Sequence, residues 1–172
     1  MKPKAKGTGF REPRRDQITH RLGLEKESVH DTYKLRGKLP EPTVCPQCGA
    51  VFHKGRWTWA TRPADAHEEI CPACHRTRDR CPAGTIHLIG PFLNTHKEEI
   101  LNLVRNQEVE AKREHPLSRI LSIDEEKDGV VVTTTDTHLP RRIGEALRRA
   151  HHGELDFHYG QDPRLIRMTW KA

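Results

Sequence analysis

Cys45-Pro46-Gln47-Cys48 is followed, after a further 22 residues, by Cys71-Pro72-Ala73-Cys74. Two Cys-x2-Cys pairs at this separation can place four thiolates around one tetrahedral ion, which is the ligand set of a structural zinc site. Tight turns of this kind also point backbone N–H groups at the sulfurs and offset their charge. The pattern predicts a Zn²⁺ site whose ligands are Cys45, Cys48, Cys71 and Cys74, with two disulfides or a redox pair as the alternatives.

The residues around the two pairs are expected to form a zinc-ribbon module over residues 41–81. Residues 50–53 and 56–59 suit two short strands around a Lys54-Gly55 turn. A module of this size cannot build a sufficient core alone, so the metal must contribute folding free energy, on the order of 10–16 kcal/mol. Because four thiolates complete the ligand set, we expect His53, His67 and His75 to be surface histidines and Cys81 a free thiol.

Positive charge is concentrated at one end of the 172-residue chain, whose formal net charge is +6. Residues 1–40 hold eleven Lys and Arg against five Asp and Glu. In the rest of the chain, basic and acidic residues are equal in number. We expect residues 1–40 to be a basic, largely disordered arm that reaches along phosphates, with a solubilising tail as the alternative. This basic excess indicates an anionic partner, with nucleic acid as the first candidate.

The sequence contains neither a run of about 20 apolar residues nor a signal-peptide pattern. We therefore expect a cytoplasmic protein without a membrane partner. In that reducing compartment, paired cysteines bind metal more often than they form disulfides.

Motifs of catalysis are also missing from the sequence. It has no Gly-rich phosphate loop, no serine nucleophile elbow and no His-Glu-x-x-His. Four cysteines would fill the coordination shell of the metal and leave no position for water. We expect a protein that is not an enzyme and has no small-molecule substrate.

Beyond Pro82, short apolar alternations and one-sided apolar periods follow one another, as in alternating strands and helices. The expected strands cover residues 85–89, 117–123, 130–134, 155–159 and 166–170. The expected helices run from a Thr95–Glu98 capping box to before Pro116, and from Asp136 or Thr137 to Gly153. The order β-α-β-β-α-β with one more strand predicts an α+β fold, in which a ferredoxin-like domain (residues 82–172) follows the zinc ribbon.

The second of these helices has an apolar side and a charged side. The apolar side holds Leu139, Ile143, Ala146, Leu147 and Ala150. The opposite side carries four arginines, Arg141, Arg142, Arg148 and Arg149. Such a face either binds phosphates or is simply solvated, and the sequence leaves both possibilities open.

Several short stretches resemble the archaeal and eukaryotic Nmd-type adaptor for export of the large ribosomal subunit. In chain order they are Cys71–Arg76, Ile123–Gly129, Thr134–His138 and Arg141–Ile143. Gly55–Trp57 and Gly144–Leu147 are similar to stretches of a family of small bacterial zinc-ribbon proteins. The resemblance covers roughly residues 40–172. Pro140 and Cys81 depart from the adaptor's pattern, and its export role is not carried over.

This resemblance implies binding to the large ribosomal subunit without enzymatic activity, and zinc ligation by the four cysteines. It also implies that His138 and Arg141, at the start of the second helix, match a histidine and a basic position of the adaptor. We therefore expect a zinc-binding protein that docks on RNA, with ribosomal RNA or the ribosome as partner. The candidate RNA-binding residues are Arg56, Trp57, Arg76, His138, Arg141, Arg142, Arg148 and Arg149. Trp57 and Trp59 suit stacking on bases, but we favour packing over the ribbon or at its junction with the next domain.

Two other functions fit the same residues. Cys-Pro-x-Cys pairs with Gly49 and nearby aromatic residues also resemble a rubredoxin-type iron site, which would make the chain an electron-transfer protein. A regulatory zinc module that binds a protein or DNA is the second alternative. The sequence does not determine the oligomeric state.

Overall fold

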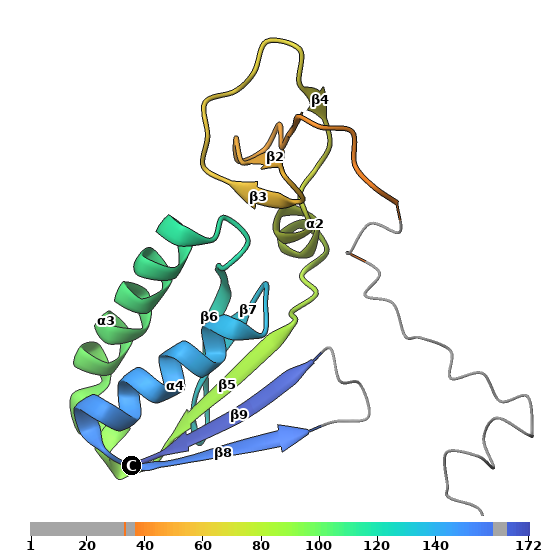
Figure 1. Ribbon diagram of the computed structural model, residues 1–172. Coiled ribbons are helices and arrows are strands. Elements are labelled where there is room, and N and C mark those ends of the chain that lie inside the picture. Colours follow the sequence, from red (N-terminus) through yellow and green to blue (C-terminus); the bar gives the residue numbers. More distant parts are fainter. Residues whose placement is uncertain (1–32, 34–36, 160–164) are drawn as a thin grey trace, which may run out of the picture.

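The computed structural model describes Tyr33 and residues 37–159 and 165–172. These residues form an α+β structure with two parts: a small sheet near the four cysteines, and a larger mixed sheet with two helices over one face (Figure 1). A short helix, α2, connects the two parts. Most of the expected basic arm lies outside the described residues, so the structure does not test it.

The small sheet is built from four short strands. They are β1 (Thr43–Val44), β2 (Val51–His53), β3 (Arg56–Thr58) and β4 (His67–Glu68), in the order β3-β2-β1-β4. β2 and β3 form the expected antiparallel hairpin, and the turn residues Lys54 and Gly55 have φ of 50° and 76°. Two successive residues with positive φ are the geometry that suits a two-residue hairpin turn.

The second cysteine pair lies at the start of a helix and not in a second hairpin. α2 (Pro72–Asp79) begins directly after Cys71, and Pro72 stands in its first turn, where a missing N–H costs little. β1 pairs in parallel with β4, which brings the chain before α2 next to the first cysteine pair. The module is therefore zinc-ribbon-like in its first half, while a helix N-terminus supplies the other two sulfurs.

The larger part alternates strands and helices much as the sequence predicts. Its elements are β5 (Gly84–Ile89), α3 (Pro91–Glu114), β6 (Ile120–Glu126), β7 (Gly129–Thr134), α4 (His138–His151), β8 (Glu154–Tyr159) and β9 (Ile166–Lys171). Figure 1 shows α3 and α4 side by side over one face of the sheet. The core between these layers includes Ile86, Leu88, Ile143, Met168 and Trp170.

The position of the last strand differs from the simple ferredoxin-like expectation. The sheet order is β6-β7-β5-β9-β8, so β9 lies between β5 and β8 and runs parallel to β5. Met168 and Trp170 on β9 are fully buried, whereas Phe157 on β8 is 39% exposed. The more apolar strand therefore takes the interior position, and β8 becomes an edge.

Two expected boundaries are wrong. α3 begins at Pro91 and not at Thr95, although its helical geometry is interrupted at His96 (φ −121°, ψ 25°), directly after Thr95. The Thr95 hydroxyl donates to the Phe92 carbonyl at 3.1 Å and does not cap the helix. β6 begins at Ile120 and not at Leu117, because residues 117–119 turn toward the metal module and Thr135. None of the helices in the described part of the chain, α3 included, has the length and apolar run needed to cross a membrane.

The start of α4 is as predicted, with Asp136 as the capping side chain. Its Oδ1 atom accepts from the backbone N–H groups of His138 at 3.0 Å and Leu139 at 2.8 Å. At the other end, Gly153 has φ of 78° and follows the last helical turn. The expected apolar side is buried except for Ala150, which lies in the final turn and is exposed.

Candidate metal centre and junction groove

The four cysteines of the two pairs form one compact cluster. Their sulfur atoms all lie within 4.8 Å of one another, and the Cys48 and Cys71 sulfurs are 3.7 Å apart. A tetrahedral ion with metal–sulfur bonds of about 2.3 Å holds its ligands roughly 3.8 Å apart. All four cysteines are free and the 3.7 Å separation is far longer than a disulfide bond, so the arrangement fits a metal ion such as zinc.

Backbone groups hold the ligands in place. The Cys45 N–H donates to the Ala50 carbonyl at 2.8 Å, which closes the first turn, and Gly49 takes a φ of 76° within it. The Cys71 N–H points at the Cys45 sulfur at 3.4 Å. Cys71 and Cys74 also lie at the positive end of the α2 dipole, which favours thiolates.

Arg119, from the loop before β6, extends the site beyond the metal module. Its Nη1 atom donates to the Cys74 sulfur at 3.3 Å, and its Nη2 lies 4.0 Å from the Cys71 sulfur. The guanidinium is held by Nε, which donates to the Pro116 carbonyl at 2.7 Å. A fixed positive charge beside the sulfurs offsets one of the two excess negative charges of a Zn²⁺–Cys₄ centre.

The protonation of the thiols follows from burial and from Arg119. Burial alone would raise the pKa of Cys48, but hydrogen bonds from the Ala50 backbone and from Arg119 lower that pKa to about 7. Burial raises the pKa of Cys71 and Cys74, and Arg119 offsets only part of the rise at Cys74. Without metal, at least these two sulfurs therefore carry protons near neutral pH.

Metal affinity should consequently fall as the pH falls. Because metal must displace protons from Cys71 and Cys74, and increasingly from Cys48 as the pH falls below 7, the apparent affinity should weaken by at least about a hundredfold per pH unit below neutrality. Competition with a chromophoric chelator between pH 6 and 8 measures this slope. A change below about tenfold per unit would mean that the thiols are already ionised in the metal-free protein.

The other candidate ligands stay outside the cluster, as expected. Among the described residues, the only group of histidines, cysteines and carboxylates placed for a metal is the four-cysteine set. The His53 ring lies 3.7 Å from the Glu41 carboxylate, and the His75 ring is 3.0 Å from Arg78. Cys81 is half-buried and lies near Tyr33 and Arg76, away from the cluster.

A cavity of about 860 Å³, which we call the junction groove, lies where the metal module meets the larger part. One wall comes from the module, another from the end of α3, the following loop and the first turn of α4. The third comes from residues 37–39 of the lead-in segment (residues 37–42). The groove lining includes Lys38, Phe52, Arg56, Trp57, His115, Leu117, Asp136, His138, Leu139 and Arg142.

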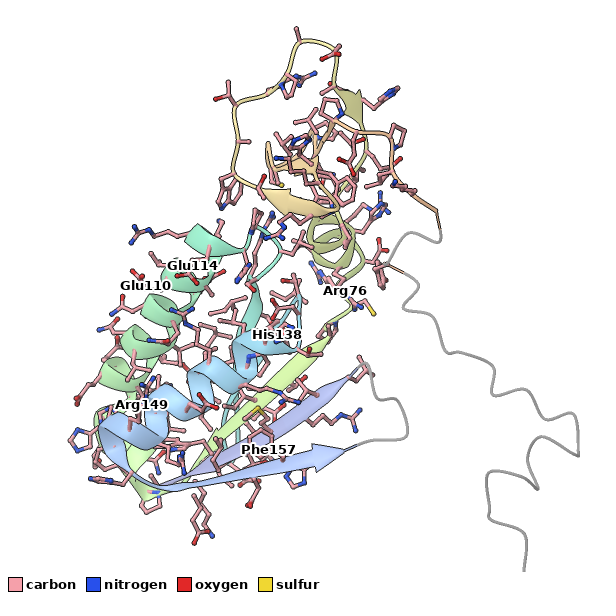
Figure 2. The ribbon with its side chains drawn as sticks, viewed as in Figure 1. Arg76, Glu110, Glu114, His138, Arg149 and Phe157 are labelled. Carbon is pink, nitrogen blue, oxygen red and sulfur yellow. The ribbon has the colours of Figure 1, made fainter. Side chains whose placement is uncertain are left out.

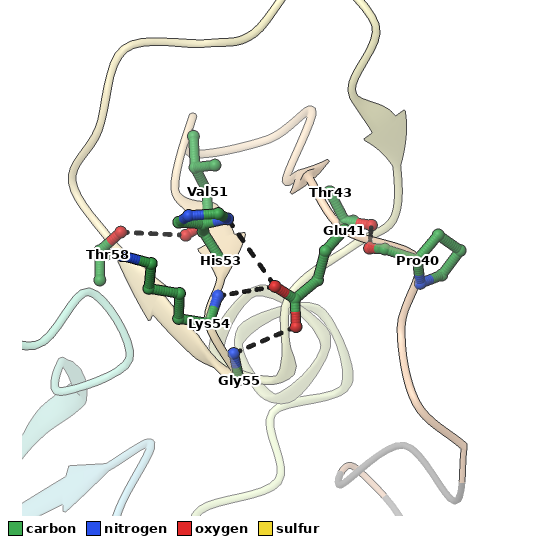
Figure 3. Close-up of polar contacts among 8 residues, drawn as sticks. All are labelled: Pro40, Glu41, Thr43, Val51, His53, Lys54, Gly55 and Thr58. Atoms are coloured by element: carbon green, nitrogen blue, oxygen red, sulfur yellow. Dashed lines mark hydrogen bonds and ion pairs between the residues drawn. The ribbon is translucent and has the colours of Figure 1, made fainter.

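The lead-in segment is fastened to the metal module by Glu41. Figure 3 shows its carboxylate accepting from the backbone N–H groups of Lys54 at 2.7 Å and Gly55 at 3.2 Å. The Thr43 hydroxyl donates to the Pro40 carbonyl at 2.5 Å and fixes the next turn of the chain. Lys38 and Leu39 are thereby held against the hairpin as part of the groove wall.

The structure divides the eight candidate RNA-binding residues into two groups. Four line the junction groove: Arg56, Trp57, His138 and Arg142. Figure 2 shows His138 at the end of α4 nearest the metal module and Arg149 at the opposite end. The other four, Arg76, Arg141, Arg148 and Arg149, are not part of the groove lining.

The arginines of α4 do not form one face. Arg141 lies over the Phe157 ring of β8, 5.9 Å from its centroid. Arg142 points to α3, where Nε donates to Gln107 at 3.2 Å and Nη1 lies 3.7 Å from the Glu114 carboxylate. The helical spacing of these residues spreads them over two sides of α4, and only Arg142 reaches the groove.

Arg76 is inside the protein. It is 5% exposed, donates to the Cys81 carbonyl at 3.1 Å, and lies 4.4 Å from the centroid of the Tyr33 ring. These contacts give it a structural role between α2 and the chain before the metal module. A side chain this buried offers little surface to RNA.

The two tryptophans of the module have different roles. Trp59 is 43% exposed, and its indole N–H donates to the Lys112 carbonyl of α3 at 2.6 Å, so it joins the two parts as expected. Trp57 packs beside the cysteine cluster and lies 5.5 Å from the Phe52 ring, and it also lines the groove. Trp57 therefore packs within the metal module and also forms part of the groove surface.

Sequence reasoning missed Lys38, His115, Leu117 and Arg119. None of them belongs to a metal or nucleic-acid motif, and Arg119 follows Cys74 by 45 residues. The only local signal was proximity to proline or glycine: His115 and Leu117 flank Pro116, and Lys38 follows Gly37, whereas Arg119 has no such neighbour. Their convergence depends on how the two parts pack.

Comparison with known proteins gives no further assignment. The chain matches no protein-family model, and no curated protein matches its sequence. The resemblance to the ribosomal export adaptor therefore rests on the short stretches quoted above. The geometry of the chain itself supports a Cys₄ metal centre beside a cationic groove.

Proposed function

We propose that the chain is a non-enzymatic zinc-binding protein that docks on RNA, with ribosomal RNA or the ribosome as its partner. The observation that carries this proposal is the convergence of cations from three distant segments on the junction groove. Lys38, Arg56 and Arg142 line it, together with His115 and His138.

The acidic group that lines the groove does not cancel this charge, although Arg142 also lies 3.7 Å from the Glu114 carboxylate of α3. Asp136 is the one acid among the described lining residues, and its carboxylate accepts from the Ser118 hydroxyl and from two backbone N–H groups of α4. Arg56 has no carboxylate partner among the described residues. The groove thus offers charge to phosphates, which is how most protein–nucleic acid contacts position a protein.

The metal centre supports a binding role more than a catalytic one. Four cysteines complete a tetrahedral shell, so a bound ion keeps no open position for a substrate or water. The ion would fold the module and hold Arg56 and Trp57 at the groove. Iron in place of zinc would instead favour electron transfer, and a red protein on purification would reveal it.

Sedimentation of the full chain from its own cells, at low and high salt, tests the proposed partner. We expect migration with ribosomes or the large subunit at low salt and release as salt rises, because phosphate contacts release counterions. Protein that stays at the top of the gradient in both buffers would contradict a ribosomal partner.

Paired charge variants test the proposed surface. Arg56→Gln with Arg142→Gln should weaken binding to single-stranded RNA and lower the slope of log K against log salt by about 1.4, for two lost phosphate contacts. Arg148→Gln with Arg149→Gln removes the same charge from the far end of α4 and is the matched control. Fluorescence anisotropy over a salt series measures both, and an equal loss in the two pairs would remove the groove from the proposal.

A further inference from the structure

Most of the junction groove surface below its cations is apolar. Phe52, Trp57, Pro72 and Leu117 are half-buried and contribute carbon surface from both parts of the molecule. We call this apolar surface the groove floor. A site that bound only phosphates would not need it. Carbon surface of this kind suits the flat face of a nucleobase, which stacks on aromatic side chains with little sequence preference.

The cations lie around the same cavity as these apolar residues. Lys38 and Arg56 are exposed, and Arg142 is half-buried between its α3 partners and the groove. A base on the floor would leave its own phosphates near these side chains. The volume of about 860 Å³ falls within the range of small-ligand sites and accommodates one or two nucleotides.

From this arrangement we propose that the junction groove takes an unpaired base of the bound RNA, which stacks on Trp57 while Lys38, Arg56 and Arg142 contact the flanking phosphates. This inference rests on the proposed RNA-binding function and makes it more specific. A base inside a duplex is already stacked and paired, so the groove selects single-stranded or bulged RNA. His138 and His115 lie at the groove as hydrogen-bonding groups for the base edge or sugar.

Abasic RNA separates base stacking from phosphate binding. The zinc-loaded full chain is titrated with a labelled single-stranded oligonucleotide and with the same strand lacking its central bases. We expect about tenfold tighter binding of the strand that keeps its bases, the scale of one stacked base. Trp57→Leu should bring the two strands within about twofold of each other, and Trp57→Phe should keep most of the difference.

Trp57→Leu also removes packing beside the cysteine cluster, so a loss of binding could reflect a disturbed metal module. Tryptophan fluorescence gives a second measurement that does not need this variant. Base-bearing RNA should quench emission that the wild-type protein shows and Trp57→Phe lacks, and abasic RNA should not. Trp59 and the fully buried Trp170 are present in both proteins, so the difference between wild type and Trp57→Phe reports Trp57 alone.

Each outcome decides a different part of the proposal. Equal binding of both strands by the wild-type protein, with no quenching, would overturn base insertion and leave RNA docking intact. Binding of neither strand above the level of the Arg56→Gln/Arg142→Gln variant would overturn RNA docking as well. The groove would then serve another occupant, such as a polypeptide segment.

Discussion

Replacing Cys71 with serine is expected to release the metal and unfold the metal module, while the larger sheet stays folded. Cys71 is fully buried among the other ligands, and a hydroxyl is a poor substitute for a thiolate on zinc. Binding of a structural zinc contributes on the order of 10–16 kcal/mol, which a module with so few aliphatic residues cannot replace. The larger part has its own core around Ile86, Met168 and Trp170.

Cys81→Ser is the matched control for this prediction, because it makes the same chemical change outside the cluster. Elemental analysis should find one zinc in the wild-type protein and in Cys81→Ser, and less than one tenth of that amount in Cys71→Ser. Backbone NMR signals from residues 43–68 should collapse in Cys71→Ser while those of α3, α4 and β9 persist. Full zinc retention by Cys71→Ser would exclude the four-cysteine centre, and loss of the sheet signals would mean that the two parts fold together.

Replacing Arg119 with methionine should weaken zinc binding by about ten- to a hundredfold, the usual cost of losing an outer-shell partner of a metal ligand. The change keeps a long side chain but removes the charge and the N–H groups that face the Cys74 and Cys71 sulfurs. Arg119 lies in the larger part, so its loss also loosens the junction between the two parts. Chelator competition measures the affinity.

Two further variants test whether Arg119 acts through direct contact with the sulfurs or only through its charge. Arg119→Lys keeps the charge but not the paired N–H donors, so its affinity should fall between those of the wild-type protein and Arg119→Met. Arg78→Gln removes a nearby cation on α2 that pairs with Asp79 and does not contact a sulfur. Equal effects of Arg78→Gln and Arg119→Met would show that only net charge matters, and would contradict a direct contact.

The four-cysteine cluster could be predicted from sequence because its chemistry is local. Cys-x2-Cys spacing fixes two sulfurs on one turn, and only one partner pair exists in the chain. The Lys54-Gly55 turn and the cap at Asp136 were predictable for the same reason, since each depends on a few adjacent residues. The helix at the second pair was not predicted, because Pro72 suits both a turn and the first turn of a helix.

The sequence pattern could not predict the features that depend on how the elements pack together. β8 and β9 both alternate apolar and polar residues, and only the competition for the sheet interior places Trp170 inside and Phe157 at the edge. The four arginines of α4 looked alike, yet Arg141 packs over β8 and Arg142 faces α3. The junction groove forms only where the two parts meet, so no local sequence motif predicts it.

Photo-cross-linking of RNA to the zinc-loaded full chain, followed by mapping of the linked peptides, tests the central claim most directly. The oligonucleotide carries 4-thiouridine at single positions, so that a cross-link reports a base within contact distance. If the groove binds RNA, links should fall on residues 52–57, residues 115–118 and the first turn of α4, and should disappear with Arg56→Gln/Arg142→Gln. Links confined to the far end of α4 around Arg148 and Arg149, or to the edge strands β6 and β8, would contradict it.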